Sequence, residues 1–208
     1  MDEPLVGIID VGACNLSSVR NAIYEQGYDW KSVSNPDDFG DITHLILPGV
    51  GHFAELMQRL HRQHLPDAIR AFVDNGHPTL AICLGMQLLA DHSEEGNVDG
   101  LGIIPGQVRK LNVDPLRTPH IGWNEVKFVS SHPVLKEIKE KRDFYFVHSY
   151  HFSVEQPLNC LATTPYGFDF CSMVHQKNIV GAQFHPEKSQ KNGLKLIENF
   201  CDWDGLNA

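Results

Sequence analysis

Three short apolar runs, each followed by residues with helical spacing, constrain the fold of this chain more than any other feature. The runs are LVGIID (5–10), HLILP (44–48) and PTLAI (78–82). A continuous apolar run of this length is typical of a strand that is buried on both faces. Strands that alternate with helices form parallel sheets, so we expect an α/β fold with a mostly parallel central sheet.

The apolar spacing between and after these runs predicts the helices. The first is expected to start at an Asn15 cap and to stop at Gly27, because Leu16, Val19 and Ile23 share one helical face. The others are expected over residues 54–76, divided at Pro66, over 84–92, and over 189–203.

The second half of the chain has a different pattern. GIIPGQVRKL, WNEVKFVSS, FYFVHSYHFSV, NCLATTP, DFCSMVH and NIVGAQF are closely spaced runs that resemble strands. Such spacing predicts antiparallel strands added to the parallel sheet. We found no internal repeat or linker, so we expect residues 1–208 to form one domain.

Composition excludes several classes of function. The formal net charge is -9 and no basic stripe is present, which is unfavourable for binding nucleic acid. The first residues, MDEPLVGIIDVG, match neither a signal peptide nor a membrane span. The five cysteines are widely spread without a CxxC pair, so we expect a reducing cytoplasm and no disulfide framework.

The stretch ICLGMQ (82–87) places Cys83 between the third apolar run and the helix after it. A nucleophile on such a sharp strand-to-helix turn projects at the open end of the strands, and the adjacent helix N-terminus favours the thiolate. Ala81 and Gly85 are small enough to permit the turn. Taken alone, the hexapeptide fits a buried core cysteine equally well.

The stretch QFHPEKS (183–189) follows another strand-like run. If this segment is extended, His185 and Glu187 point to the same side, so that Glu187 can orient the ring of His185. His185 is then free to take a thiol proton. A loop histidine and an exposed carboxylate are the alternatives for each residue taken singly, whereas the combination with Cys83 favours a nucleophile, a base and an orienting acid.

A glycine-rich turn, LPGVGHF (47–53), ends the second apolar run. Gly49, Val50 and Gly51 can turn a backbone N–H towards a developing oxyanion, with the N–H of Leu84 as a second donor. Such turns are also common between ordinary strands and helices.

Taken in order, PGVG, ICLGMQLL and FHPEKS resemble the class I glutamine amidotransferases, and the resemblance covers essentially the whole chain. More narrowly, PHIGWNEV (119–126) and FYFVHSYHF (144–152) are similar to the glutaminase subunits of imidazole glycerol phosphate synthases. The resemblance implies the flavodoxin-like fold of the family and hydrolysis of glutamine to glutamate and ammonia, without a cofactor or a metal. His61 and His64 are three apart on an expected helix, but no acid or cysteine completes a ligand set, so we interpret them as surface residues.

The resemblance also implies roles for individual residues. Cys83, His185 and Glu187 match the catalytic positions, and Gly49, Val50, Gly51 and Leu84 match the oxyanion positions. Gln87, Glu95, Ser149 and Tyr150 match the substrate-binding positions, and His120, Trp123, Asn124 and Lys188 match an interface with a (β/α)8-barrel cyclase. Two residues depart from the usual pattern: Ala81 replaces a glycine, and Thr118 replaces an aliphatic residue.

Two other functions remain open at this stage. A related glutaminase subunit could supply ammonia for amidation of a surface-polysaccharide sugar, and the glutaminase residues alone do not separate the two. A non-catalytic regulatory module or a redox-sensing cysteine protein is the third possibility. It would need neither the Gly49–Gly51 turn nor Gln87.

Overall fold

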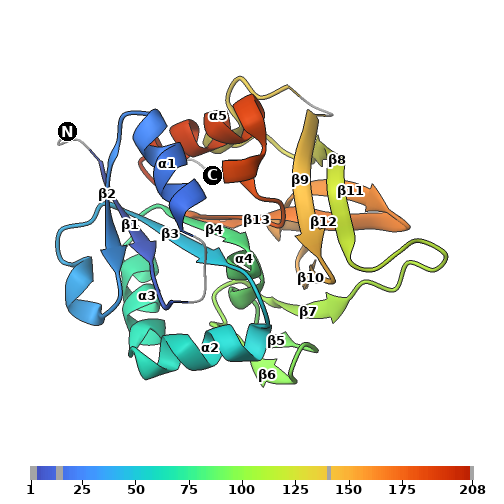
Figure 1. Cartoon of the computed structure of the whole chain (residues 1–208), viewed down its shortest axis with the longest axis horizontal. Helices are drawn as coiled ribbons and strands as arrows, with labels where there is room; N and C mark the ends of the chain where they lie inside the picture. Colours follow the sequence, from blue (N-terminus) through green and yellow to red (C-terminus); the bar gives the residue numbers. More distant parts are fainter. Residues whose placement is uncertain (1–3, 13–15, 140–141, 207–208) are drawn as a thin grey trace.

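The computed structural model describes residues 4–12, 16–139 and 142–206, and a single twisted sheet runs through them (Figure 1). The strands lie in the order β2-β1-β3-β4-β13-β12-β10-β7-β5-β6, and β11, β8 and β9 branch from β12. Their bounds are β1 Leu5–Ile9, β2 Asp29–Val33, β3 His44–Gly49, β4 Thr79–Cys83, β5 His92–Ser93, β6 Val98–Asp99, β7 Gly106–Lys110, β8 His120–Phe128, β9 Arg142–His148, β10 Tyr150–Val154, β11 Cys160–Tyr166, β12 Phe168–Gln176 and β13 Ile179–Ala182.

Five neighbouring strands, β2, β1, β3, β4 and β13, form the parallel half of the sheet. Alternate residues of these strands enter opposite core clusters: Ile46 packs on one face, and Leu45 and Leu47 pack on the other. Because both of their faces are buried, β1, β3 and β4 have continuous apolar runs, as the sequence predicted.

Helices cover both faces of this half, as Figure 1 shows. Helices α1 (Ser17–Glu25) and α5 (Gln190–Cys201) pack on one face, and α2 (Phe53–Arg62) and α3 (Leu65–Asp74) pack on the other. The predicted division of 54–76 is confirmed, since His64 has a left-handed backbone and Pro66 lies in the first turn of α3. The predicted cap, Asn15, lies outside the described residues.

The strands β12, β10 and β7 extend the sheet beyond β13 in antiparallel pairs, and β11, β8 and β9 pair antiparallel with one another beside it. The predicted fold class, a mostly parallel sheet with antiparallel strands in the second half, is therefore confirmed. The run NIVGAQF was expected among the antiparallel strands, but it forms β13, which lies between the two halves of the sheet and pairs parallel with β4 and antiparallel with β12. Strand β2 and the two-residue strands β5 and β6 were not predicted.

Two further expectations can be compared with the structure. Within the described residues, no helix is long and apolar enough to cross a membrane. The four cysteines that the structure describes, Cys83, Cys160, Cys171 and Cys201, are free thiols.

Candidate active site

Cys83 joins the end of β4 to the start of α4 (Leu84–Leu88), as the sequence predicted. Its backbone has φ 56° and ψ −113°, a conformation that costs a residue with a Cβ atom about 1–3 kcal/mol. The turn places Cys83 at the carboxyl end of a central strand, where open α/β sheets bind their ligands. Strain at such a position is typical of a functional residue.

Two glycines allow the chain to pass close to this turn. A Cβ atom on Gly85 would overlap the carbonyl group of Leu47 in β3, and a Cβ atom on Gly49 would overlap the backbone N of Gly85. Gly49 is directly opposite Cys83 in the parallel register of β3 and β4. The close approach of β3 to the first turn of α4 therefore needs glycine at both positions.

Helix α4 is shorter than predicted: it ends at Leu88 rather than residue 92. The segment 100–104 folds back and donates backbone hydrogen bonds to the carbonyl groups of 88–91, including one of 2.7 Å from Leu101 N to Leu88 O. These long-range bonds take the acceptors that a longer helix would use.

His185 and Glu187 form a buried pair beside the thiol. His185 Nδ1 lies 2.7 Å from Glu187 Oε1, and the two side chains are only 2% and 5% exposed. The predicted pairing is present, although residues Pro186–Lys188 form a 3-10 turn instead of the extended segment assumed from the sequence. The turn brings the carboxylate back to the ring because Glu187 follows His185 by only two residues.

Backbone contacts fix the position of His185. Its N–H donates to Tyr145 O in β9 at 2.9 Å, and its carbonyl group accepts from Ser189 Oγ at 2.6 Å. Ser189 Oγ also accepts from Tyr145 N at 3.0 Å. The turn and the strand are thus joined by a closed set of hydrogen bonds that limits movement of the ring.

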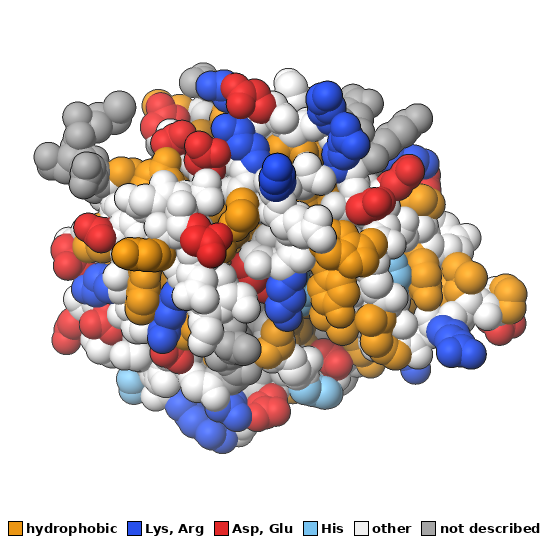
Figure 2. Space-filling model, turned by 45° about the horizontal axis from the view of Figure 1, so that its top comes forward, with side chains coloured by type: hydrophobic (Ala, Val, Ile, Leu, Met, Phe, Trp, Pro, Cys, Tyr) orange, Lys and Arg blue, Asp and Glu red, His pale blue; other side chains and the backbone are white. Residues whose placement is uncertain are grey.

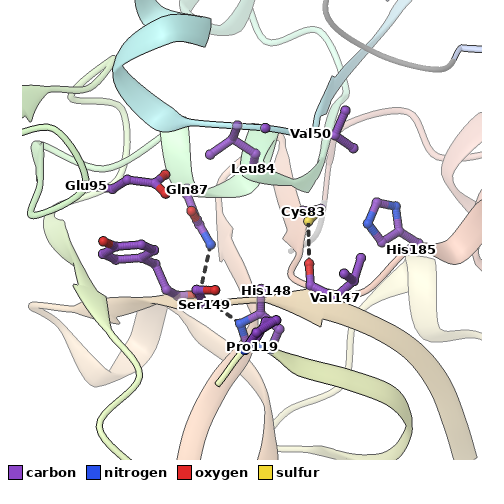
Figure 3. Close-up of a pocket in the computed structure, with 12 residues that line it drawn as sticks. Val50, Cys83, Leu84, Gln87, Glu95, Pro119, Val147, His148, Ser149 and His185 are labelled. Carbon is purple, nitrogen blue, oxygen red and sulfur yellow. Dashed lines mark hydrogen bonds between the residues drawn. The ribbon is translucent and has the colours of Figure 1, made fainter. Parts of the chain in front are cut away.

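The ring of His185 favours its charged form. Burial lowers the pKa of His185, but the interactions with Cys83 and with Glu187 raise it by a larger amount, so that the pKa is about 9. Nε2 of His185 is buried and forms no hydrogen bond within the described residues, and in Figure 3 the ring lies beside Cys83. This nitrogen is therefore placed to exchange a proton with the thiol or with a group bound to it.

A cavity of about 290 Å³ opens beside Cys83 and His185 (Figure 3). The structure places the following predicted residues around it: Val50, Gly51, Leu84, Gln87, Glu95, Ser149 and Tyr150. Gly49, the residue before Val50, does not line the cavity. The candidate residues come from five separate parts of the sequence, so the fold brings together what the motifs indicated separately.

Gln87 and Glu95 are each held in place at the edge of this cavity. Gln87 Nε2 donates to Tyr150 O and to Gln183 Oε1, both at 2.9 Å, which leaves its side-chain oxygen to face a ligand. Glu95 Oε2 accepts from Phe53 N at 2.8 Å, at the start of α2. An anionic carboxylate anchored at a helix N-terminus can bind a ligand ammonium without much loss of side-chain freedom.

Sequence reasoning missed Gln183 and His148. Gln183 is fully buried, and its Nε2 lies 3.9 Å from Cys83 Sγ. Gln183 precedes His185 by two residues at the end of a strand. In an extended chain this spacing puts both side chains on the same side, so the sequence could have indicated Gln183 as well. His148 lines the cavity next to Ser149, and it was part of the motif that indicated Ser149 and Tyr150.

The four candidate interface residues differ in exposure. Trp123 is 48% exposed, Lys188 is exposed and Asn124 is half-buried, but His120 is only 3% exposed. His120 therefore lies beneath the surface formed by its neighbours. Figure 2 shows hydrophobic side chains gathered on the side of the molecule where β8 and β9 lie, and Ile121 and Trp123 are among the exposed apolar residues of β8.

A metal centre has little support in the described part of the chain. No group of three or more His, Cys, Asp or Glu side chains there is arranged to hold an ion. His61 and His64 are both exposed, as expected for surface residues.

The fold and the site together define an α/β protein with a strained cysteine at the end of a central strand and a buried histidine–glutamate pair beside it. Consistent with this class, residues 7–203 match the sequence profile described as glutamine amidotransferase class-I. The chain belongs to this family.

Two proteins of similar sequence are subunits of imidazole glycerol phosphate synthases. The chain is 46% identical over 197 residues to the imidazole glycerol phosphate synthase subunit HisH of Dehalococcoides mccartyi, covering 94% of this chain and 96% of that protein. It is 43% identical to HisH 2 of Nitrobacter winogradskyi, covering 96% and 98%. PurLQS from Thermotoga maritima has a TM-score of 0.78 at 16% identity, covering 96% of this chain and 98% of that chain, which supports the fold alone.

Proposed function

We propose that this chain hydrolyses glutamine to glutamate and ammonia, as the glutaminase subunit of an imidazole glycerol phosphate synthase. The observation that carries the proposal is the geometry at Cys83, a strained cysteine facing the buried His185–Glu187 pair in a cavity. The identity to HisH proteins over nearly the whole chain supports the choice of pathway.

The chemistry begins with attack of the Cys83 thiolate on the carboxamide carbon of glutamine. The C–N bond then breaks as His185 gives its proton to the leaving nitrogen, which departs as ammonia and leaves a glutamyl thioester. His185 next takes a proton from water, the resulting hydroxide attacks the thioester, and the sulfur leaves. Glu187 holds the ring and stabilises its positive charge throughout.

Backbone donors complete the reaction centre in this proposal. The N–H of Leu84 follows the nucleophile directly, and the Gly49–Gly51 segment lies beside it at the end of β3. Either group can stabilise the negative charge that develops on the substrate oxygen. Gly51 has φ 101°, a conformation that only glycine adopts without strain, so the segment has the freedom to orient an N–H.

Substrate glutamine would be held by its amino-acid end. We assign its ammonium to Glu95, its carboxylate to backbone groups of Ser149 and Tyr150, and a further polar contact to Gln87. The anchored Glu95 carboxylate is the group best suited to read the positive charge.

The ammonia would pass to a (β/α)8-barrel cyclase bound as the second subunit of a cytoplasmic heterodimer. The docking surface that we assign comprises Trp123, Asn124 and Lys188, with Ile121 beside them. Trp123 and Ile121 are 48% and 60% exposed, and an aromatic anchor within a polar surround is typical of a binding interface. His120 would support this surface from below.

The test is release of glutamate from glutamine by the purified chain, measured with and without the cognate cyclase and a nucleotide ligand of the cyclase. We expect stimulation by the cyclase and loss of activity in Cys83→Ala, with Cys201→Ala as the control because Cys201 is buried in α5 away from the cavity. A cyclase that neither binds nor stimulates would contradict the histidine pathway. A sugar-modifying partner would then be the next candidate.

A further inference from the structure

Three polar side chains form a line from the surface of β8 to the wall of the cavity. His120, at the start of β8, is directly opposite His148, at the end of β9, and Asn124 lies one hydrogen bond further out. The two rings are only 3% and 6% exposed. The His120 ring stacks on Tyr166 and Phe146, with centroid distances of 3.9 and 4.9 Å.

The hydrogen bonds of Asn124 fix the direction of this line. Asn124 Oδ1 accepts from the backbone N of Glu125 at 2.8 Å, and its Nδ2 donates to Pro165 O at 2.9 Å. The assignment of the amide oxygen and nitrogen is therefore determined by backbone groups with a single role each. The same Nδ2 lies 3.3 Å from His120 Nε2, which must consequently act as an acceptor without a proton.

Only one proton arrangement of the two rings satisfies the remaining bonds. A neutral His120 carries its proton on Nδ1 and donates to His148 Nε2 at 2.9 Å. His148 then carries its own proton on Nδ1 and donates to Tyr150 O at 2.8 Å. Burial lowers the pKa of His120 to about 4 and that of His148 to about 3, so both rings are neutral near pH 7.

From His148 the hydrogen bonds continue through the Tyr150 carbonyl group towards Cys83. Tyr150 O accepts a second hydrogen bond from Gln87, and Gln87 in turn donates to Gln183, which lies near the Cys83 sulfur. The dashed lines from His148 and Gln87 in Figure 3 mark the two bonds that meet at this carbonyl group. A displaced Tyr150 carbonyl would therefore displace Gln87 as well.

We propose that His120 and His148 are positioning residues, which hold the Tyr150 carbonyl and Gln87 in the geometry that binds glutamine. This inference rests on the proposed glutaminase function and adds a pair of residues to it. The outer end of the line is Asn124, so a change at the docking surface can reach the glutamine pocket through the pair, although Asn124 itself does not line the cavity.

Substitutions can separate the two hydrogen bonds of His148. In His148→Asn the amide nitrogen lies near the former Nδ1 and can still donate to Tyr150 O. In His148→Gln the amide lies near the former Nε2, and the bond to Tyr150 O is lost. His120→Phe keeps the stacked ring but removes both of its hydrogen bonds. His175→Phe is the control, because His175 is a partly buried histidine whose Nδ1 forms no hydrogen bond within the described residues and which does not line the cavity.

The experiment measures kcat and KM for glutamine with the cyclase bound. We expect His148→Gln and His120→Phe to raise KM roughly five- to tenfold with kcat changed much less, as for loss of one hydrogen bond that orients substrate. His148→Asn should raise KM less than His148→Gln, because it keeps a donor for Tyr150 O but, like His120→Phe, loses the bond between the two rings. Asn124→Ala should raise KM, and the control should be unchanged. Unchanged KM in both His148→Gln and His120→Phe would overturn the proposal.

A spectroscopic measurement is independent of activity. Nitrogen–proton correlation spectra of the histidine side chains at pH 7 should show the proton on Nδ1 in both His120 and His148. A proton on Nε2 of either ring would overturn the proposed direction of the line. If the wild type releases no glutamate under any condition, the proposed function fails, whereas the proton positions still decide whether the hydrogen-bonded pair exists as described.

Discussion

The difference in stability between an alanine and a glycine variant should be much smaller at position 83, where the protein has a cysteine, than at an ordinary strand position. Cys83 has φ 56°, where a residue with a Cβ atom is strained by about 1–3 kcal/mol and glycine is not. Cys83→Ala keeps this strain, and Cys83→Gly removes it. Ala182 provides the reference, because it is fully buried in the regular strand β13.

The magnitude follows from three contributions. At Ala182, glycine loses about 0.5–1 kcal/mol through the freedom of the unfolded backbone and about 0.8 kcal/mol of buried methyl surface. The substitution Ala182→Gly should therefore destabilise the fold by about 1.5 kcal/mol. At position 83 the same losses are offset by relief of strain, so Cys83→Gly should be about as stable as Cys83→Ala or slightly more stable.

Urea denaturation of the wild type and the three variants, followed by tryptophan fluorescence, measures these differences. The comparison uses the midpoint only where the slope of the unfolding free energy with urea is unchanged. If glycine costs as much at position 83 as at position 182, the backbone at Cys83 is not strained and the argument for a functional turn is wrong.

Other substitutions and conditions should have separable effects. Glu187→Gln should lower kcat about 10²–10⁴-fold, because the amide stabilises the His185 imidazolium poorly. Glu95→Gln should raise KM for glutamine about 10–100-fold through loss of a charge-assisted bond, yet keep the acceptor for Phe53 N–H. Burial lowers the pKa of His148 to about 3 from its usual 6.5, so below pH 6.5 the unfolded chain binds a proton that the folded chain does not, and stability should fall as pH drops towards 3.

Each of these expectations has a direct check. Steady-state kinetics at saturating glutamine test Glu187→Gln, and a kcat equal to that of the wild type would rule out the orienting role. Kinetics and urea denaturation together test Glu95→Gln, for which a stability loss equal to that of Glu95→Ala would show that the amide does not replace the carboxylate. Urea midpoints at pH 7.5 and pH 5 test the predicted loss of stability at low pH. The midpoint should change less with pH in His148→Gln than in the wild type.

The parts of the fold that could be predicted are those whose residues face a single environment. The strands β1, β3 and β4 are buried on both faces and show it as apolar runs. Strand β2, DWKSV, is at the edge of the sheet and partly exposed, so it has no such run and was missed. The early end of α4 was missed because it depends on hydrogen bonds from residues 100–104, which no local pattern reveals.

The candidate site also contains residues that could be predicted from the sequence and residues that could not. Cys83 could be placed because a strand, a turn and a helix are local features, and the turn was predicted where the apolar run ends and the helical spacing begins. The pair of His120 and His148 could not, because these residues are separated by 28 positions and meet only when β8 and β9 pair. The partnership of Gln87 with Gln183 likewise depends on the juxtaposition of α4 and the end of β13.

The central claim is that Cys83 is the nucleophile for glutamine, and covalent labelling tests it most directly. The chain, bound to its cyclase, would be treated with a diazoketone analogue of glutamine, and the modified peptide would be identified by mass spectrometry. The account predicts an adduct on Cys83 that excess glutamine prevents and that Glu95→Gln slows. Labelling of another cysteine, or labelling of Cys83 that glutamine does not prevent, would contradict it.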